Sequence, residues 1–415
     1  MIAEILSIGT ELLMGQIANT NAQFISKHFT EVDIFVYYHS VVGDNKKRIK
    51  SSLLMALERA DVVITTGGLG PTQDDITKEV ISEVLNKPLV VREEILSEIK
   101  KFFIEKGKVM TLNNEKQAYF PLDSILIKNK MGTAPGCLIE YNNKIIIMLP
   151  GPPSEMRPMF LQFVIPFFEK KGTYQLKSKF IRIFGIGESA MESKISDLIS
   201  SQSNPTIAPY TKQGEVTLRV SARYNKKNEN VEKILDPTIK KIKERLGEYI
   251  YSYDNEELKV VAYKKLYNSN IKISLAESCT GGLLAKYITD IPGSSSIFES
   301  SIVTYSNASK IKLLEVQKST IDKYGAVSEQ VAIEMAKGLY KKTLSQLVVA
   351  ITGIAGPSGG TKDKPVGLVY ISLGYKGKIN VRKLNLWGSR DRIRHVTCLN
   401  AFDFIIKTIT EEETN

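Results

Sequence analysis

Strand patterns and helix patterns alternate through the first 170 residues of this chain, and this order limits the folds that it can adopt. The apolar segments Ile2–Ile8 and Ile34–Val42 are typical of buried strands, and Asn19–Phe29 between them has apolar residues at helical spacing. The pattern closes with a strand at Lys144–Leu149 and a helix over residues 154–168. Parallel strands joined by right-handed helical crossovers satisfy this order. We therefore predict an α/β domain built on a parallel sheet.

The pattern changes near residue 170, where Lys170–Thr173 has the composition of a linker. Beyond it, the alternating segment Glu215–Tyr224 predicts a half-buried antiparallel strand. A second α/β pattern follows, with helices predicted over 331–344 and 390–409 and a frayed acidic tail at 411–413. We therefore predict three domains, namely an α/β domain (1–170), a small α+β middle domain (171–254) and a C-terminal α/β domain (255–415).

The composition is that of an ordinary globular protein, with 43% hydrophobic and 24% charged residues. The apolar runs are far shorter than the ~18 residues that a membrane helix needs, so we expect no membrane partner. The cysteines Cys137, Cys279 and Cys398 lie far apart, which argues against a disulfide framework and for a reducing cytoplasm. The net charge of +11 reflects dispersed lysines, and the chain carries no recognition motif for nucleic acid. We therefore expect a small, anionic partner rather than nucleic acid.

The segment Ala276–Gly282 (Ala-Glu-Ser-Cys-Thr-Gly-Gly) follows a predicted strand and precedes a predicted helix. A serine at such a helix start can attack a carbonyl carbon while nearby backbone N–H groups stabilise the oxyanion. Ser278 is therefore the candidate nucleophile. The candidate oxyanion site is the backbone of Cys279, Thr280, Gly281 and Gly282. Spacing alone favours the alternative that Ser278 or Thr280 is the N-cap of the helix.

A serine nucleophile requires a base, and histidine is scarce in this chain. His395 is the only histidine after His39, so a Ser–His–Asp triad has thin support. A lysine with a lowered pKa can replace histidine, and Lys310, one helical turn beyond a predicted strand, is the candidate. As a lone lysine, it is otherwise expected at the surface. Cys279 is a rival nucleophile, although its position favours a small buried hydrophobic residue.

Two further segments of the C-terminal domain carry residues that are suited to an anionic ligand. The loop Thr352–Gly360 follows a predicted strand, and Gly353 and Gly356 would let its backbone approach a ligand closely. Arg390 and Arg394 open the last predicted helix, where guanidinium groups suit a phosphate. The alternatives are a flexible turn and a solvated basic helix face.

In the N-terminal domain, two loops follow predicted strands at the strand ends where open α/β sheets bind ligands. We assign phosphate binding to small residues of these loops, namely Gly9, Thr10, Gly67, Gly68, Gly70 and Thr72. The carboxylates of Glu11, Asp74 and Asp75 suit a hard divalent cation such as Mg²⁺. Helix capping by Asp74 or Asp75 is the alternative.

Six segments of the chain match the motifs of one known family, in the same order. They are Ser7–Leu13, Thr66–Asp75, Leu149–Met156, Ala276–Gly282, Val303–Asn307 and Thr352–Pro357. On these residues, the protein resembles the full-length form of the CinA family of competence/damage-inducible proteins. The resemblance covers essentially the whole chain and implies an N-terminal domain similar to the molybdopterin-binding fold.

The resemblance also implies two activities. The C-terminal domain looks like a nicotinamide-nucleotide amidase, which hydrolyses nicotinamide mononucleotide to nicotinate mononucleotide and ammonia in pyridine nucleotide recycling, without a cofactor. Carried over by position, Ser278 would be the nucleophile and Lys310 its base. Tyr305 and Thr352 would orient the site, and Arg394 would bind the nucleotide phosphate. The N-terminal domain is linked in this family to ADP-ribose pyrophosphatase activity that depends on Mg²⁺, Co²⁺ or Mn²⁺, and the family suggests a homodimer.

One position departs from the family pattern. Ser389 stands where the family has aspartate in a Gly-Asp-Arg motif, which bears on the geometry of Arg390. Two other classes of function stay open at this point. One is a nucleotide- or pterin-binding module with a degenerate amidase site, against which the intact Ser278, Tyr305 and Lys310 argue. The other is an accessory protein of competence or recombination, against which the missing nucleic-acid motifs argue.

Overall fold

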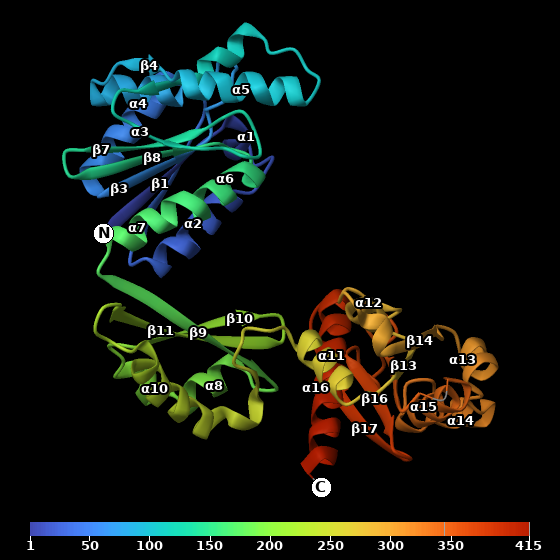
Figure 1. The fold of residues 1–415 in the computed structure, drawn as a ribbon. Helices are drawn as coiled ribbons and strands as arrows, with labels where there is room; N and C mark the ends of the chain where they lie inside the picture. The colour runs from blue at the N-terminus through green and yellow to red at the C-terminus, as the bar shows by residue number, and fades with distance from the viewer. Residues whose placement is uncertain (344, 415) are drawn as a thin grey trace. The chain divides into compact units, whose positions relative to one another are not determined.

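The structure is a computed structural model that describes residues 1–343 and 345–414. It divides into two compact units, which are described separately below (Figure 1). One unit comprises Met1–Lys177 with Ala222–Ile234, and the other comprises Ser178–Ser221 with the chain from Leu235 onward. The three cysteines are buried and unpaired. None of the described helices is both long and apolar enough to span a membrane.

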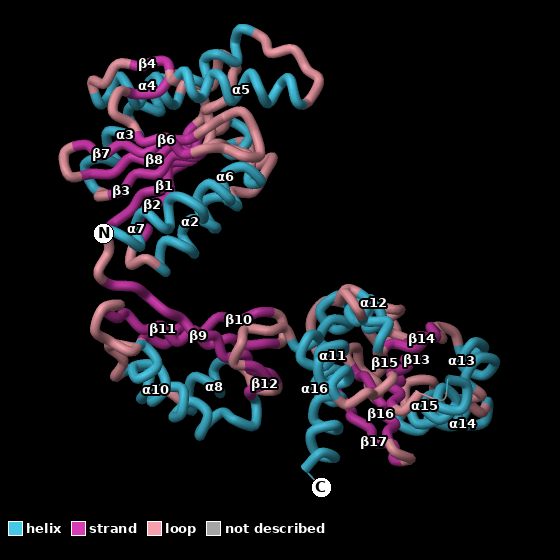
Figure 2. Tube along the Cα trace, viewed as in Figure 1, coloured by secondary structure: helices cyan, strands magenta, loops and turns pink. Residues whose placement is uncertain are grey.

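The N-terminal unit is built from alternating strands and helices (Figure 2). Its strands are β1 (Ile2–Ile8), β2 (Phe35–Val42), β3 (Val62–Thr66), β4 (Leu89–Val91), β5 (Tyr119–Pro121), β6 (Ile125–Ile127), β7 (Gly136–Tyr141) and β8 (Lys144–Leu149). Its helices are α1 (Thr10–Leu13), α2 (Thr20–Glu31), α3 (Lys46–Arg59), α4 (Thr77–Leu85), α5 (Glu93–Glu105), the 3₁₀ helix η1 (Leu112–Ala118), α6 (Pro153–Met159), the π-helical turn η2 (Phe160–Val164) and α7 (Ile165–Lys171).

The main sheet of this unit has the strand order β2-β1-β3-β8-β7-β6. The four strands from β2 to β8 are parallel, which confirms the prediction for this part of the sheet. β7 instead pairs antiparallel with both β8 and β6. The parallel pattern is broken because β7 and β8 are joined by a tight hairpin rather than a helix. Asn142 and Asn143 form its turn in left-handed conformations, with φ of 46° and 63°.

Helices cover both faces of this sheet. Leu6 and Ile8 of β1 belong to one core cluster, whereas Ala3 and Ile5 belong to another. The first cluster includes residues of α3 and α4, and the second includes residues of α2 and α7. Because neighbouring side chains of a strand point to opposite faces, β1 carries apolar residues on both of its faces. The loops that follow β1 and β3 therefore open at the carboxyl edge of a rigid, fully covered sheet.

The middle segment and the C-terminal domain contribute two further sheets. The middle elements are β9 (Tyr174–Phe184), α8 (Glu188–Lys194), α9 (Ser196–Ser200), β10 (Thr206–Lys212), β11 (Glu215–Asn225), α10 (Val231–Leu246), η3 (Gly247–Tyr249) and β12 (Ile250–Ser252). The C-terminal elements are α11 (Leu258–Asn268), β13 (Ile273–Glu277), α12 (Leu283–Thr289), η4 (Ser294–Ser296), β14 (Phe298–Val303), α13 (Asn307–Leu314), α14 (Lys318–Tyr324), α15 (Glu329–Thr343), β15 (Leu347–Gly353), β16 (Leu368–Tyr375), β17 (Lys378–Asn385) and α16 (Arg390–Thr414).

The C-terminal sheet has the order β14-β13-β15-β16-β17. β13 lies between β14 and β15, parallel to both, whereas β16 and β17 are antiparallel. One face packs against α11, α12 and α16, and the other against α13, α14 and α15. The carboxyl end of β13 therefore opens at the middle of three parallel strands, where ligands bind in open α/β sheets.

The C-terminal ends of two helices in this domain, α16 and α15, differ from what the sequence predicted. The predicted frayed tail is wrong, because α16 continues through Thr414 and Glu412 and Glu413 pair with Lys376 and Lys265. The predicted helix over 331–344 matches α15, except that its last residue, Leu344, lies outside the described residues, as does Asn415 of the predicted third domain.

Candidate functional site

Ser278 lies directly after β13, and its backbone is held on both sides. Its N–H donates to the carbonyl of Ile351 in β15 (3.1 Å). On the other side, the N–H of Thr304 donates to the carbonyl of the preceding residue, Glu277 (2.8 Å). The side chain of Ser278 is nearly buried, with 8% of the residue exposed. The start of the loop that carries the serine is thus hydrogen-bonded to the segments on both sides of β13.

The fully buried Glu277 fixes the loop that carries Ser278. Its carboxylate accepts hydrogen bonds from the backbone N–H groups of Gly282 (3.0 Å), Leu284 (3.1 Å) and Ala285 (2.9 Å) at the start of α12. A carboxylate is favourable at a helix N-terminus, where N–H groups lack partners. This helix has no side-chain cap from Ser278 or Thr280, so the capping alternative for Ser278 is wrong. The sequence prediction missed the role of Glu277, although an acid at the end of an apolar strand was its signal.

Lys310 reaches Ser278 from α13. Its Nζ lies 3.0 Å from Ser278 Oγ and 2.9 Å from the carbonyl oxygen of Thr304. The lysine is 2% exposed, so the surface alternative is wrong. Burial lowers the pKa of Lys310, because the ammonium form loses hydration. No carboxylate forms an ion pair with Lys310 among the described residues, so little opposes that effect.

A neutral lysine in contact with a serine hydroxyl can act as a general base. The oxyanion would then need free N–H donors. Within the predicted stretch, Gly281 donates to the carbonyl of Ser278 (3.0 Å) and Gly282 donates to Glu277. The described contacts leave Cys279 and Thr280 as the two backbone amides of the stretch that are available to an oxyanion.

Cys279 has the environment of a structural cysteine. It is 6% exposed, and burial raises the pKa of its thiol to about 12, so the thiolate is scarce at neutral pH. The histidine that would have to activate it, His395, has its Nδ1 hydrogen-bonded to the hydroxyl of Tyr287 (2.9 Å). These contacts favour Ser278 over Cys279 as the nucleophile.

Arg390 links two of the predicted segments. It donates from Nη1 to the carbonyl of Gly356 (2.8 Å) and from Nη2 to the hydroxyl of Tyr305 (2.8 Å). Tyr305 is 62% exposed, which leaves its ring accessible beside the site. The first residue of α16 therefore holds the glycine-rich loop and Tyr305 together, with Ser389 directly before it.

Arg394 lies one turn further along α16 and holds the serine loop. Its Nε and Nη2 donate to the carbonyl of Thr280, at 3.2 and 2.7 Å, whereas Nη1 lies 4.0 Å from the exposed carboxylate of Asp391. Thr352 is buried, and its hydroxyl donates to the carbonyl of Ala326 (2.8 Å). A Cβ at Gly353 would come within 3.0 Å of the backbone of β16, so this glycine serves strand packing.

The predicted N-terminal residues, with the exception of Thr10, line one pocket of about 400 Å³. Several of their N–H groups already have partners, since Gly9 donates to Val42, Gly67 to Leu149 and Thr10 to Asp44. Thr72 likewise donates both its N–H and its hydroxyl to Asp75. Gly68 and Gly70 are the predicted residues whose amides keep no described protein partner. Gly67 and Gly68 take positive φ values of 102° and 67°, which suits glycine.

Five carboxylates line the same pocket. They are Glu11, Asp44, Asp74, Asp75 and Glu155. Oxygen donors of this kind suit Mg²⁺ or Mn²⁺, and the described lining includes neither histidine nor cysteine. The carboxylates do not form a ready group of three ligands within the part of the chain that is described. A cation held here would therefore draw further ligands from the substrate, as Mg²⁺ commonly does.

Sequence reasoning missed three residues of this pocket. Asp44 follows β2 and receives two hydrogen bonds from Thr10, and Glu155 lies in the first turn of α6, in a segment that was noted only as a motif. Gln117 is 1% exposed, lines the pocket and leaves its side-chain carbonyl oxygen without a hydrogen-bond partner. The signal for Gln117 was absent, because it lies in η1, far from the glycine loops.

The fold and these contacts define a multidomain α/β protein with two separate candidate sites. Family models match three consecutive segments: "Probable molybdopterin binding domain" over residues 4–170, "Damage-inducible protein CinA KH domain" over 178–252 and "CinA C-terminal domain" over 255–409. The chain belongs to the CinA family.

Its relatives match over nearly their full length. A competence-damage inducible protein of Acetivibrio thermocellus is 53% identical over 405 residues, and a CinA-like protein of Dictyoglomus thermophilum is 50% identical over 405 residues. Each match covers 98% of both chains. The competence/damage inducible protein CihA from Agrobacterium tumefaciens has a known crystal structure. The match has 37% sequence identity, covers 36% of this chain and 92% of that chain, and has a TM-score of 0.35.

Proposed function

We propose that the C-terminal domain is a serine–lysine amidase that hydrolyses nicotinamide mononucleotide to nicotinate mononucleotide and ammonia. The observation that supports the amidase chemistry is the 3.0 Å contact between Lys310 Nζ and Ser278 Oγ, both of which are buried. The choice of nicotinamide mononucleotide rests on the family resemblance. The reaction serves pyridine nucleotide recycling.

In the first half of the reaction, neutral Lys310 takes the proton of the Ser278 hydroxyl while Oγ attacks the carboxamide carbon. The carbonyl oxygen becomes an oxyanion, for which the amides of Cys279 and Thr280 are the donors. The C–N bond then breaks, and the proton on Lys310 passes to the leaving nitrogen, which departs as ammonia. An ester between Ser278 and the pyridine carbonyl remains.

In the second half, Lys310 takes a proton from a water molecule that attacks the ester carbon. The tetrahedral intermediate collapses, and the proton returns to Ser278 Oγ. The acid product leaves with one water molecule consumed. Arg394 Nη1 is the donor proposed for the nucleotide phosphate, because the other two nitrogens hold Thr280 and a phosphate can displace the long 4.0 Å contact with the exposed Asp391.

Ammonia release from nicotinamide mononucleotide tests this proposal. Ser278→Ala should abolish release, whereas Cys279→Ala, the matched change at the neighbouring residue, should retain it. Loss of activity in Cys279→Ala with full activity in Ser278→Ala would transfer the nucleophile to cysteine. No release by the folded wild-type protein would reject the amidase.

A second function is favoured by the charge of the N-terminal pocket. Five carboxylates would repel a pyrophosphate, and no lysine or arginine belongs to the described lining. A bound divalent cation would offset the repulsion between the carboxylates and the pyrophosphate. It would also supply Lewis-acid activation of the phosphate. We therefore propose metal-dependent hydrolysis of ADP-ribose here. Glu11, Asp74 and Asp75 would hold the cation, and the amides of Gly68 and Gly70 would contact phosphate oxygens.

We also propose that the protein forms a homodimer and works in the cytoplasm. The family resemblance supports a homodimer. The unpaired, buried cysteines are compatible with a reducing cytoplasm. The mass of the protein in solution, measured by light scattering, tests the dimer directly.

A further inference from the structure

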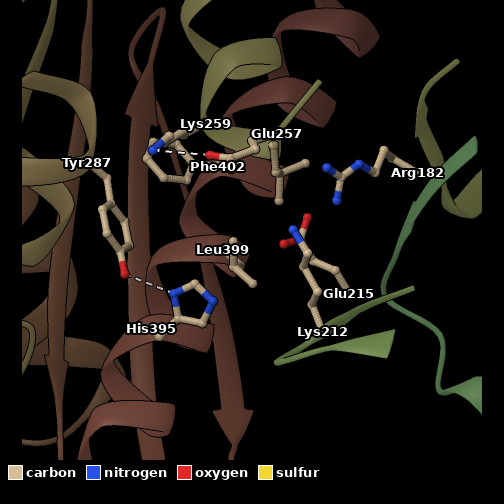
Figure 3. A pocket seen from close by; sticks show the side chains of 10 residues that line it. Arg182, Lys212, Glu215, Glu257, Lys259, Tyr287, His395, Leu399 and Phe402 are labelled. Atoms are coloured by element: carbon tan, nitrogen blue, oxygen red, sulfur yellow. Dashed lines mark hydrogen bonds and ion pairs between the residues drawn. The ribbon is translucent and has the colours of Figure 1, made fainter. Parts of the chain in front are cut away.

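The unit that carries Ser278 has a cavity whose lining differs from the residues of the amidase site. Its volume is about 180 Å³, and Figure 3 shows its side chains converging from the middle strands and from α11, α12 and α16. Neither Ser278 nor Lys310 belongs to this lining. The cavity therefore needs its own explanation.

The side chain that sets the chemistry of this cavity is Arg182 of β9. The residue is 6% exposed, yet its hydrogen bonds go to neutral groups, from Nε to Asn255 Oδ1 (2.9 Å) and from Nη1 to Thr217 Oγ1 (3.3 Å). Nη2 makes a long contact with the carbonyl of Asn255 (3.4 Å). No carboxylate lies within ion-pair distance among the described residues. A buried guanidinium without a directly paired carboxylate is costly, and an anion in the cavity would lower that cost.

The charges around the cavity leave one positive charge in excess. Lys259 and Glu257 pair with each other at 3.1 Å (Figure 3). Arg182 and Lys212 then face a single remaining carboxylate, Glu215, which also accepts a hydrogen bond from the hydroxyl of Tyr251. Two positive charges against one negative charge are complementary to a ligand with one negative charge.

The opposite wall of the cavity is apolar. Leu258, Leu399 and Phe402 line it, and each is at most 5% exposed. His395 lies beside them with Nδ1 bound to Tyr287, which leaves its Nε2 edge toward the cavity (Figure 3). A ligand that fills this space needs a hydrocarbon part as well as a charged end.

We propose that this cavity binds a small organic monocarboxylate. The carboxylate lies against Arg182 and Lys212, and its hydrocarbon part packs on Leu258, Leu399 and Phe402. A volume of about 180 Å³ corresponds to roughly six water molecules, so the ligand has about six to eight non-hydrogen atoms. A branched short-chain acid has this size and shape.

Calorimetric titration of the full chain with isovalerate and with its neutral amide, isovaleramide, tests the proposal. The two probes share a shape and differ in charge. All proteins in the experiment carry Ser278→Ala, so that the amide cannot be hydrolysed and failure of the amidase proposal does not affect the result. Isovalerate should bind at least tenfold more tightly than isovaleramide, because a charge-assisted hydrogen bond is worth roughly 1.5–3 kcal/mol.

Three variants place the binding in this cavity. Arg182→Met should abolish binding of isovalerate. Lys212→Met should weaken it several-fold, and since Lys212 is exposed, this variant keeps the test decisive if Arg182→Met does not fold. Lys101→Met, which removes the same charge from an exposed lysine of α5, should leave the affinity unchanged. Equal affinity for acid and amide, no binding of isovalerate, or full affinity in Lys212→Met would each overturn the proposal.

Discussion

At the scale of single residues, the proposed mechanism depends most on Lys310. Its amine is buried against a serine hydroxyl and two backbone carbonyls, none of which bears a negative charge. The ammonium form is therefore the disfavoured one, which is why its pKa is lowered. A base works only while it is neutral, so the proposed reaction has a pH dependence of defined sign.

We predict that ammonia release by the wild-type protein falls as the pH drops through the lowered pKa of Lys310, because protonation removes the base. Lys310→Arg should lose roughly 10²–10⁴-fold in rate at every pH, since a guanidinium stays protonated. The measurement is a pH–rate profile, with Lys286→Arg on the exposed face of α12 as control. A wild-type rate that rises toward acid pH would contradict this role for Lys310.

The sequence predicted Ser278 and Lys310 but not the contacts of their neighbours. Ser278 was recognisable because a hydroxyl residue follows an apolar strand and precedes glycines. The burial of Lys310 was not, because it depends on packing between residues 32 positions apart. The same holds for Arg394, predicted to bind phosphate. Its hydrogen bonds to the Thr280 carbonyl depend on how α16 faces the loop, which no periodicity encodes.

At the scale of elements, the start of α12 depends on one carboxylate. Glu277→Gln would keep the shape of the side chain but present an amide NH₂ to backbone N–H groups, which leaves donors unsatisfied. We predict a loss of about 1–3 kcal/mol in stability and a fall in kcat that exceeds any change in KM, because the loop carries the nucleophile. Steady-state kinetics and thermal unfolding measure both. Glu299→Gln on β14 is the control, and an unchanged kcat would show that Glu277 does not position the loop.

Helix α4 and η1 are joined by a second buried lysine. Lys78 donates to the carbonyls of Lys116 and Gln117, both at 3.0 Å, and burial lowers its pKa to about 8. Between about 8 and the ordinary value of 10.5, the unfolded chain binds more protons than the folded one. The free energy of unfolding therefore rises with pH across this window. Below the window, Lys78 is charged in both states, and the cost of burying its charge is fully present.

We predict that the free energy of unfolding of the wild type, measured against Lys78→Met, increases by roughly 3 kcal/mol as the pH rises from about 8 to 10.5. Urea unfolding of both proteins across this range measures the difference, from which other titrating groups cancel. Lys144→Met, at a half-buried lysine that donates to one carbonyl of the same unit, is the control. A flat or falling difference would contradict a neutral buried Lys78.

Elements with a local signal were predictable, and elements that depend on pairing were not. The strands β1, β3 and β15 were predictable because both their faces are buried, which gives them mostly apolar sequences. β10 was not predicted, since its side chains are largely exposed and only its hairpin pairing with β11 defines it. The acidic end of α16 looked frayed because its stabilising partners, Lys265 and Lys376, are distant in sequence.

At the scale of the whole molecule, the two proposed chemistries belong to different compact units. The carboxylate pocket is formed by residues between Ile8 and Glu155, whereas Ser278 and Lys310 belong to the other unit. The motif order along the sequence predicted this division, because each motif follows its own run of strands. Three carboxylates of the N-terminal pocket were predicted from its glycine loops, whereas Asp44 and Glu155 were not, because only folding brings them to the pocket.

This separation predicts opposite responses to two perturbations of the same protein. A metal chelator, or Asp74→Asn, should abolish hydrolysis of ADP-ribose, because the pocket carboxylates then lack the cation that offsets their repulsion of the substrate. Neither should change ammonia release from nicotinamide mononucleotide, because the mechanism proposed for it uses Ser278 and Lys310 and no metal. Ser278→Ala should reverse the pattern.

Asp123→Asn supplies the matched control, because Asp123 is an exposed aspartate of the same unit outside the pocket and should leave both activities intact. Both products can be measured in one sample. A general loss of folding would lower both activities together, whereas loss of one site would lower only one of them. ADP-ribose hydrolysis that survives both the chelator and Asp74→Asn would reject the metal site. Ammonia release that stops with the chelator would instead place the metal in the serine–lysine chemistry and reject the mechanism proposed for it.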